Sequence, residues 1–109
     1  DVIISGGENI YPVQIEDFLR THDAIKDVAV IGLPDDRLGE ISAAIIELKP
    51  GYSCTEQDIM AFCTSLPRYK RPRKIIFDNV PRNPTGKIEK PKLREKYGAK
   101  SLVAAQTQK

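Results

Sequence analysis

The sequence predicts an α+β (α/β) domain, in which a small three-stranded β-sheet carries flanking helices and an N-terminal Gly-Gly β-hairpin stands beside it. Three observations predict this fold. Runs rich in β-branched residues alternate with segments whose apolar residues recur at helical spacing. The length of 109 residues suits one compact domain. The apolar fraction of 40% and charged fraction of 29% are close to globular averages, so the chain can bury a core.

The first elements are a hairpin and a short helix. Val2–Ser5 is a β-rich run, the glycine pair after it marks a tight turn, and Asn9–Tyr11 can return as a second short strand. Pro12 suits the first turn of a helix. That helix is expected over Val13–Thr21, because its apolar residues gather on one face.

The middle of the chain supplies the predicted sheet. Val28–Leu33 and Ile41–Leu48 are β-rich runs separated by a polar connection, and Lys74–Phe77 is a third run. Between the last two we expect a helix, since Thr55 and Asp58 have the spacing of a capping box.

The remaining boundaries come from proline and glycine. The second helix is expected to end near Pro67, and Pro81–Gly86 is too rich in these residues for regular structure. Glu89–Tyr97 predicts a last helix stopped by Gly98. We therefore expect one domain over residues 1–100 and a disordered tail over 101–109.

Composition and charge exclude several classes of function. The net charge of +2 is too small to indicate a nucleic-acid partner. Cys54, Cys63 and His22 supply neither a metal-ligand set nor a disulfide framework, so no metal site is predicted. No run of apolar residues is long enough for a membrane span, and a cytoplasmic location is expected. Because the chain opens on Asp1 without a methionine, we expect a domain of a longer protein.

Three segments are not explained by packing. Gly6 and Gly7 permit positive φ and remove side-chain bulk, so the backbone there can approach a ligand; an ordinary tight turn is the alternative. In Arg68–Lys74, five of seven residues are cationic and Tyr69 is interleaved. Such a cluster can hold phosphates while the ring stacks on a base, although a solvated charge run is the usual explanation.

The third segment is Pro81–Ile88, which contains a Gly-Lys pair. It does not fit a phosphate-binding Walker loop, because Pro81 stands where that pattern needs glycine and Ile88 where it needs Ser or Thr. Lys87 remains as a single charge on a flexible stem, suited to neutralising phosphate or carboxylate oxygens during a reaction.

Together these segments resemble the C-terminal (lid) domain of the adenylate-forming superfamily, of the acyl-CoA synthetase or AMP-dependent synthetase and ligase type. The resemblance covers roughly Asp1–Tyr97 and rests on four blocks in order: Asp1–Glu16, Val28–Glu40, Tyr69–Lys74 and Pro81–Ile88.

The resemblance implies a two-step reaction with ATP and CoA as substrates. A carboxylate and ATP give an acyl-adenylate and pyrophosphate, and the thiol of CoA then displaces AMP. Lys87 matches the lysine that acts in adenylation. The residues that match the CoA site are Ser5, Gly6, Gly7 and Glu8 near pantetheine, with Tyr69, Arg71 and Arg73 near the nucleotide end.

The resemblance also implies what lies outside the sequence. The partners are a large N-terminal domain of the same chain, which would bind magnesium, and an acyl or aryl carboxylate. The hinge would lie just before Asp1, so the isolated domain is expected to be inactive. Acetylation of Lys87 is a further hypothesis, because it would remove the charge that adenylation needs.

Two alternatives stay open. One is a stand-alone module that binds CoA or a nucleotide, or a basic interaction domain that uses Arg68–Lys74. The other is the lid of an adenylating enzyme that does not use CoA. A large domain upstream of Asp1 would support the synthetase, whereas a natural start near Asp1 would favour the stand-alone module. The acyl substrate cannot be inferred from this segment.

Overall fold

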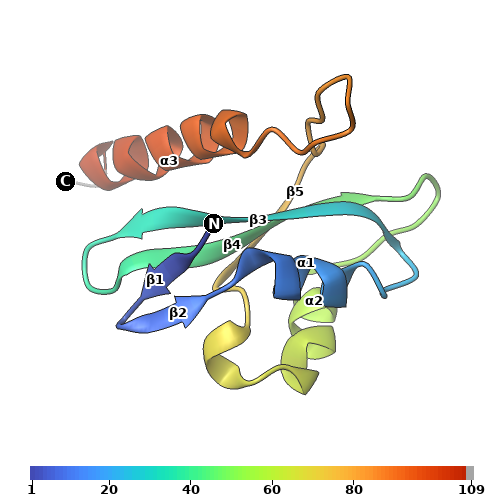
Figure 1. Cartoon of the computed structure of the whole chain (residues 1–109), viewed down its shortest axis with the longest axis horizontal. Coiled ribbons are helices and arrows are strands. Elements are labelled where there is room, and N and C mark those ends of the chain that lie inside the picture. Colours follow the sequence, from blue (N-terminus) through green and yellow to red (C-terminus); the bar gives the residue numbers. More distant parts are fainter. Residues whose placement is uncertain (108–109) are drawn as a thin grey trace.

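The computed structural model describes residues 1–107, with side chains described through Gly98, and contains one mixed β-sheet with helices on both faces (Figure 1). Its elements, in chain order, are β1 (Ile3–Ser5), β2 (Glu8–Ile10), α1 (Pro12–Leu19), β3 (Ile25–Asp35), β4 (Gly39–Leu48), α2 (Glu56–Phe62), the 3₁₀ turns η1 (Cys63–Ser65) and η2 (Arg68–Lys70), β5 (Lys74–Phe77) and α3 (Lys90–Thr107).

The α+β fold class is confirmed, but the strand count was wrong. The hairpin does not stand beside a three-stranded sheet; it belongs to a five-stranded sheet with the order β2-β1-β4-β3, and β5 pairs with β4 in parallel. The link is a single pairing of Ser5 with Gly39, where β4 begins. One such contact between distant segments leaves no periodic pattern in the sequence.

The pair formed by β3 and β4 is longer than predicted. These strands pair antiparallel from Ile25 to Asp35, so most of the polar connection around Pro34 is itself paired. Pro34 is tolerated because β3 is an edge strand, where a missing amide donor costs little. The remaining turn is short, and Asp35 Oδ2 accepts hydrogen bonds from the backbone nitrogens of Arg37 (3.2 Å) and Leu38 (2.8 Å).

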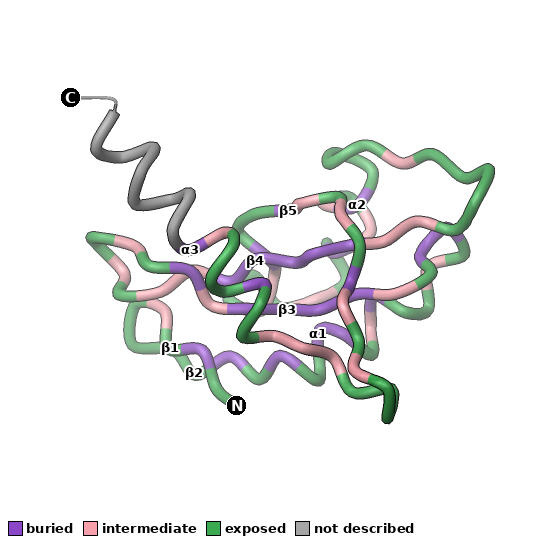
Figure 2. The backbone as a smooth tube through the Cα atoms, turned by 90° about the horizontal axis from the view of Figure 1, so that it is seen from above, coloured by how far each residue is buried: buried purple, intermediate pink, exposed green. Residues whose placement is uncertain are grey.

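Alternation along β3 and β4 gives the domain two apolar layers. Val28 and Val30 face α1 and α2, whereas Ala29, Ile31 and Leu33 face α3. Buried residues accordingly run along the middle of β3 and β4 (Figure 2). Since helices cover both faces of the sheet, polar side chains that could bind a ligand are found on the loops at its two ends.

The helices begin close to where their sequence signals indicate but end elsewhere. The predicted capping box is confirmed: Asp58 N donates to Thr55 Oγ1 (3.1 Å), and Thr55 N donates to Asp58 Oδ2 (2.9 Å). The stop at Gly98 was wrong, since α3 continues to Thr107. Gly98 is not among the glycines with positive φ, and only a left-handed glycine ends a helix in this way. The disordered tail over 101–109 stays a prediction, and its last two residues lie outside the described part of the chain.

A buried carboxylate connects three elements. Glu16 on α1 is only 5% exposed, and its Oε2 accepts a hydrogen bond from Val30 N (2.9 Å) and lies 2.8 Å from Lys90 Nζ. Lys90 and Arg94 of α3 also pair with Asp1, at 2.9 and 3.2 Å. Because each charge here has an opposite partner, the network holds the first residue and α3 to the sheet.

Candidate functional site

The glycine hairpin forms the predicted tight turn. Gly6 has φ +57° and Gly7 has φ +84°, the combination that a two-residue turn between twisted strands requires. Gly6 N donates to Leu38 O at 2.9 Å, and Ile4 N donates to Glu40 Oε1 at 3.1 Å. The turn is therefore fixed against the β3–β4 connection.

A third glycine makes room for that attachment. A Cβ atom on Gly32 would lie 2.5 Å from Glu40 Oε2, closer than real Cβ contacts come. The missing side chain lets the Glu40 carboxylate lie across β3 and reach Ile4. A side chain at Gly32 would therefore require the Glu40 carboxylate, which accepts the Ile4 hydrogen bond, to shift.

The basic segment Arg68–Lys74 is held against the sheet by a buried proline and a backbone hydrogen bond. Pro72 is fully buried, and Arg73 N donates to Ser42 O of β4 at 2.9 Å. Arg68–Lys70 forms the turn η2, which presents Tyr69 with 45% of its surface exposed. Residues 68–74 are consequently an ordered segment beside the hairpin, which we call the ledge, and not a loose run of charges.

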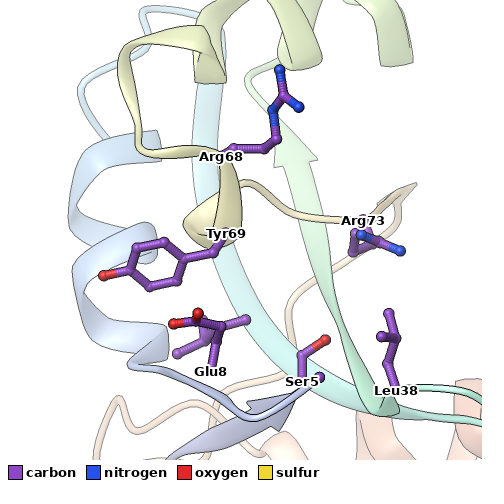
Figure 3. A pocket seen from close by; sticks show the side chains of 8 residues that line it. Ser5, Glu8, Leu38, Arg68, Tyr69 and Arg73 are labelled. Carbon is purple, nitrogen blue, oxygen red and sulfur yellow. The ribbon is translucent and has the colours of Figure 1, made fainter.

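The hairpin and this ledge form the two sides of a pocket of about 460 Å³. The hairpin supplies Ser5, Gly6, Glu8 and Ile10, the ledge supplies Arg68, Tyr69 and Arg73, and Leu38 comes from the β3–β4 turn. In Figure 3 the Tyr69 ring lies above Glu8 on one side, Arg73 lies above Leu38 on the other, and Ser5 is between them.

The lining combines three kinds of chemistry. The guanidinium group of Arg73 can bind phosphate oxygens, and the exposed Tyr69 ring offers a stacking surface, whereas the guanidinium group of Arg68 points away from Glu8 and Ser5 (Figure 3). Lys70 Nζ lies 5.8 Å from the centroid of that ring. The apolar side chains of Ile10 and Leu38 favour an aliphatic segment. An elongated ligand with a charged, aromatic end fits this arrangement.

The structure thus brings together five of the residues predicted for CoA, listed as Ser5, Gly6, Glu8, Tyr69 and Arg73. Arg71 does not line the pocket: its Nε donates to Leu66 O and its Nη2 to Thr64 O, both at 3.0 Å, which holds η1 in place. Gly7 shapes the turn without lining the pocket. Ile10, Leu38 and Arg68 were missed; only Arg68 had a sequence signal, its place in the basic cluster.

Lys87 lies in a different part of the molecule. It is exposed and belongs to the loop of residues 81–89, which Figure 1 places at the opposite end from the hairpin turn. Among the described residues, none forms an ion pair or hydrogen bond with its ammonium group. Its backbone is fixed, since Lys87 N donates to Asn83 Oδ1 and Asn83 N donates to Lys87 O, both at 2.9 Å.

The described part of the chain contains neither a cluster of metal ligands nor a reactive thiol. There, no group of three or more His, Cys, Asp or Glu side chains lies close enough to hold a metal ion. Cys54 and Cys63 are free thiols, and burial raises the pKa of Cys63, which disfavours the reactive thiolate. No helix among the described residues could cross a membrane, and the cytoplasmic location stays a prediction.

The comparison with family models decides the family. Residues 14–87 match the model of the AMP-binding enzyme C-terminal domain. The chain belongs to this family. The predicted resemblance to the adenylate-forming superfamily is thereby confirmed, and the match ends at Lys87 itself.

Relatives of this C-terminal domain are acyl-CoA ligases. It is 52% identical over 101 residues to the long-chain-fatty-acid–CoA ligase FadD13 of Mycobacterium tuberculosis, covering 91% of this chain and 20% of that protein. It is 50% identical over 98 residues to the mitochondrial medium-chain acyl-CoA ligase ACSF2 of Danio rerio, covering 88% and 16%. The chain therefore spans no more than a fifth of the length of these relatives.

Solved structures agree with this membership. A Mycobacterium tuberculosis fatty acyl CoA synthetase superposes with a TM-score of 0.85 at 51% identity, covering 92% of this chain and 20% of that one. ATP-bound MatB from Rhodopseudomonas palustris gives 0.85 at 35% identity, covering 90% and 20%. The fold of this C-terminal domain is thus that of the same part of acyl-CoA synthetases.

Proposed function

We propose that this chain is the mobile C-terminal domain of a longer AMP-forming acyl-CoA synthetase, which joins a carboxylate to CoA at the expense of ATP. A large N-terminal domain of the same chain would bind ATP, magnesium and the acyl or aryl carboxylate. The observation that carries the proposal is the separation of two sites on one small domain. Lys87, whose ammonium group has no partner among the described residues, stands at one end, and the pocket that we assign to CoA lies at the other.

Lys87 serves the first step. A carboxylate oxygen attacks the α-phosphate of ATP and pyrophosphate leaves, so negative charge shifts over the phosphate oxygens. An ammonium group that has no partner among the described residues can stabilise that charge when the loop enters the large domain. Its contribution is electrostatic stabilisation of the transition state.

The pocket serves the second step. The thiol of CoA attacks the acyl carbonyl of the adenylate, and AMP leaves. In the proposed pose Tyr69 stacks on adenine, Arg73 contacts phosphate, and pantetheine passes along Ser5, Gly6 and Glu8. Gly7 contributes by shaping the turn, and Arg71 by holding the ledge through its two carbonyl contacts.

The test is carboxylate-dependent pyrophosphate release by the full-length protein, measured across aliphatic and aryl acids. Lys87→Ala should lower release by about 10²–10³-fold, the usual loss when one stabilising donor is removed. Lys92→Ala is the matched control, because Lys92 is an exposed lysine near the loop that pairs only with Glu89 at 3.2 Å among the described residues. Normal release by Lys87→Ala would contradict the proposal.

The same assay separates the two alternatives. Pyrophosphate release without formation of an acyl-CoA thioester would favour an adenylating enzyme that does not use CoA. Absence of release with every acid would favour a stand-alone module that binds CoA or a nucleotide. The stand-alone module does not explain why Lys87, whose ammonium group has no partner among the described residues, stands on an ordered loop far from the pocket.

A further inference from the structure

Arg82 connects the loop of Lys87 to the sheet. Its Nε lies 2.7 Å from Asp27 Oδ2 and its Nη2 lies 2.9 Å from Asp27 Oδ1, a two-pronged pair between loop and β3. Its Nη1 donates to the carbonyl oxygen of Gly86. One guanidinium thus binds the sheet and the residue directly before Lys87 at the same time. A planar group with several fixed donors is suited to this double contact.

The acceptor on the sheet is itself held in place. Asp27 lies in β3 with a side chain 14% exposed, and its Oδ1 accepts a hydrogen bond from Val28 N at 2.9 Å. Arg20 Nη2 lies 3.6 Å from the same oxygen. Burial alone would raise the pKa of Asp27, but the hydrogen bonds from Arg82 and Val28 hold it below its usual value. The carboxylate is therefore charged at neutral pH and can anchor Arg82.

The other bonds of the loop are local. Asn83 Oδ1 accepts from Thr85 N at 3.1 Å and from Lys87 N at 2.9 Å, and Arg82 pairs with Ile88 in an isolated β-bridge. These contacts give the loop its shape but do not join it to the rest of the domain. Among the hydrogen bonds of the described residues, those of Arg82 to Asp27 are the ones that join residues 82–88 to the sheet.

We propose that Arg82 is a positioning residue for adenylation, which fixes the backbone at Gly86 and thereby the point from which the Lys87 side chain extends. The inference rests on the proposed role of Lys87. A lysine has a long, flexible stem, so its reach into another domain depends on where its backbone is held. A displacement of about 1 Å in a reacting group can cost roughly 10²-fold in rate.

The experiment measures both half-reactions in the full-length protein for Arg82→Ala and Arg82→Lys. We expect Arg82→Ala to lower carboxylate-dependent pyrophosphate release about 10-fold or more, while conversion of presynthesised acyl-adenylate by CoA stays within about 2-fold. Arg82→Lys should fall between Arg82→Ala and the unchanged protein, because an ammonium group can pair with Asp27 but cannot hold Gly86 in the same planar fork.

Lys26→Ala is the matched control. Lys26 precedes Asp27 on β3 and pairs with Glu47 at 3.2 Å, so its removal breaks an ion pair on the same strand while the Arg82–Asp27 pair and the hydrogen bonds within residues 82–88 are kept. Deuterium exchange of a peptide covering 82–89 supplies a readout that does not depend on catalysis. Exchange should become faster in Arg82→Ala and stay unchanged in Lys26→Ala.

Each outcome decides one point. Unchanged adenylation in Arg82→Ala, or equal loss of both half-reactions, would overturn the positioning role. Normal adenylation in Lys87→Ala would instead refute the proposed function. Unchanged deuterium exchange in Arg82→Ala would refute the attachment of the loop whichever way the lysine variant behaves.

Discussion

The pocket and the Lys87 loop are built in opposite ways. The pocket forms where three distant segments meet: the hairpin around Gly6, the turn at Leu38 and the ledge at Tyr69. The loop takes its shape from neighbouring residues, with Asn83 as the local acceptor and Arg82 as the tie to the sheet. The first is a product of tertiary structure, and the second is mainly a product of local sequence.

The difference teaches how one small domain can serve two steps. On the proposed function, the lysine and the CoA pocket lie at opposite ends of the domain (Figure 1), so a rotation of the domain would bring first one and then the other to a single active site. Because no hydrogen bond or ion pair of the described residues joins the pocket residues to residues 82–88, a change in one site should leave the other intact. The predictions below test that independence.

Among these predictions, the largest change in rate is expected for a substitution in the hairpin. Gly6→Val would place a branched side chain in the pocket, where even a Cβ atom would lie 3.0 Å from Leu38 Cδ2. Consumption of presynthesised acyl-adenylate by CoA should fall about 10-fold, since an overpacked site costs roughly 1–3 kcal/mol. Pyrophosphate release should be unchanged.

Gly7→Val is the matched control for backbone strain. Gly7 also has positive φ, but a Cβ there meets nothing within 4 Å. Both variants should lower the free energy of unfolding by about 1–3 kcal/mol, whereas only Gly6→Val should affect the CoA step strongly. Equal kinetic losses would mean that strain, and not pocket volume, is the cause.

A smaller effect is expected within the ledge. Arg73→Ala should raise the KM for CoA about 5-fold, because a partly exposed phosphate contact contributes on the order of 1 kcal/mol. Arg71→Ala should instead lower the free energy of unfolding by about 1–2 kcal/mol, since its guanidinium satisfies two carbonyls. Steady-state kinetics and thermal unfolding of the two variants check this split. A larger rise in KM for Arg71→Ala would return Arg71 to the binding site.

The smallest effect concerns acid stability near the base of the loop. A hydrogen bond from Lys96, then those from Tyr97 and Asn79, lower the pKa of Asp78 to about 2. Its ionised form therefore stabilises the fold above about pH 4, and this contribution is lost as the pH falls towards 2. Because the partner Lys96 is 51% exposed and solvent screens the pair, we expect a contribution of less than about 1 kcal/mol.

The measurement is the free energy of unfolding between about pH 4 and 2. Asp78→Asn should show a flatter dependence than the unchanged domain over this window. The control is Asp36→Asn, an exposed carboxylate on the β3–β4 turn at the pocket end. Identical slopes for the Asp78 variant and the unchanged domain would contradict the prediction.

Much of the fold was readable from the sequence because its signals are local. The capping box at Thr55 and the turn at Gly6 depend on residues within a few positions, and both are confirmed. The pairing of Ser5 with Gly39 depends on residues far apart, and it was missed. Gly98 failed as a stop signal because a glycine ends a helix only when its backbone turns left-handed.

The candidate site divides in the same way. Tyr69 and Arg73 stood out as a basic cluster with an aromatic ring, and the structure places both in the pocket. Leu38 and Ile10 carried no signal, since apolar residues are expected in any core. Arg71 was indistinguishable from its neighbours in sequence, and only its contacts with Leu66 O and Thr64 O separate it from them.

The most direct test of the central claim is a crossed assay of Lys87→Ala and Gly6→Val in the full-length protein, with both half-reactions measured for each. If the two sites act separately, Lys87→Ala should lose pyrophosphate release but still convert presynthesised acyl-adenylate. Gly6→Val should keep pyrophosphate release but convert presynthesised acyl-adenylate more slowly. Loss of both half-reactions in both variants, with each protein still folded at the assay temperature, would contradict the account.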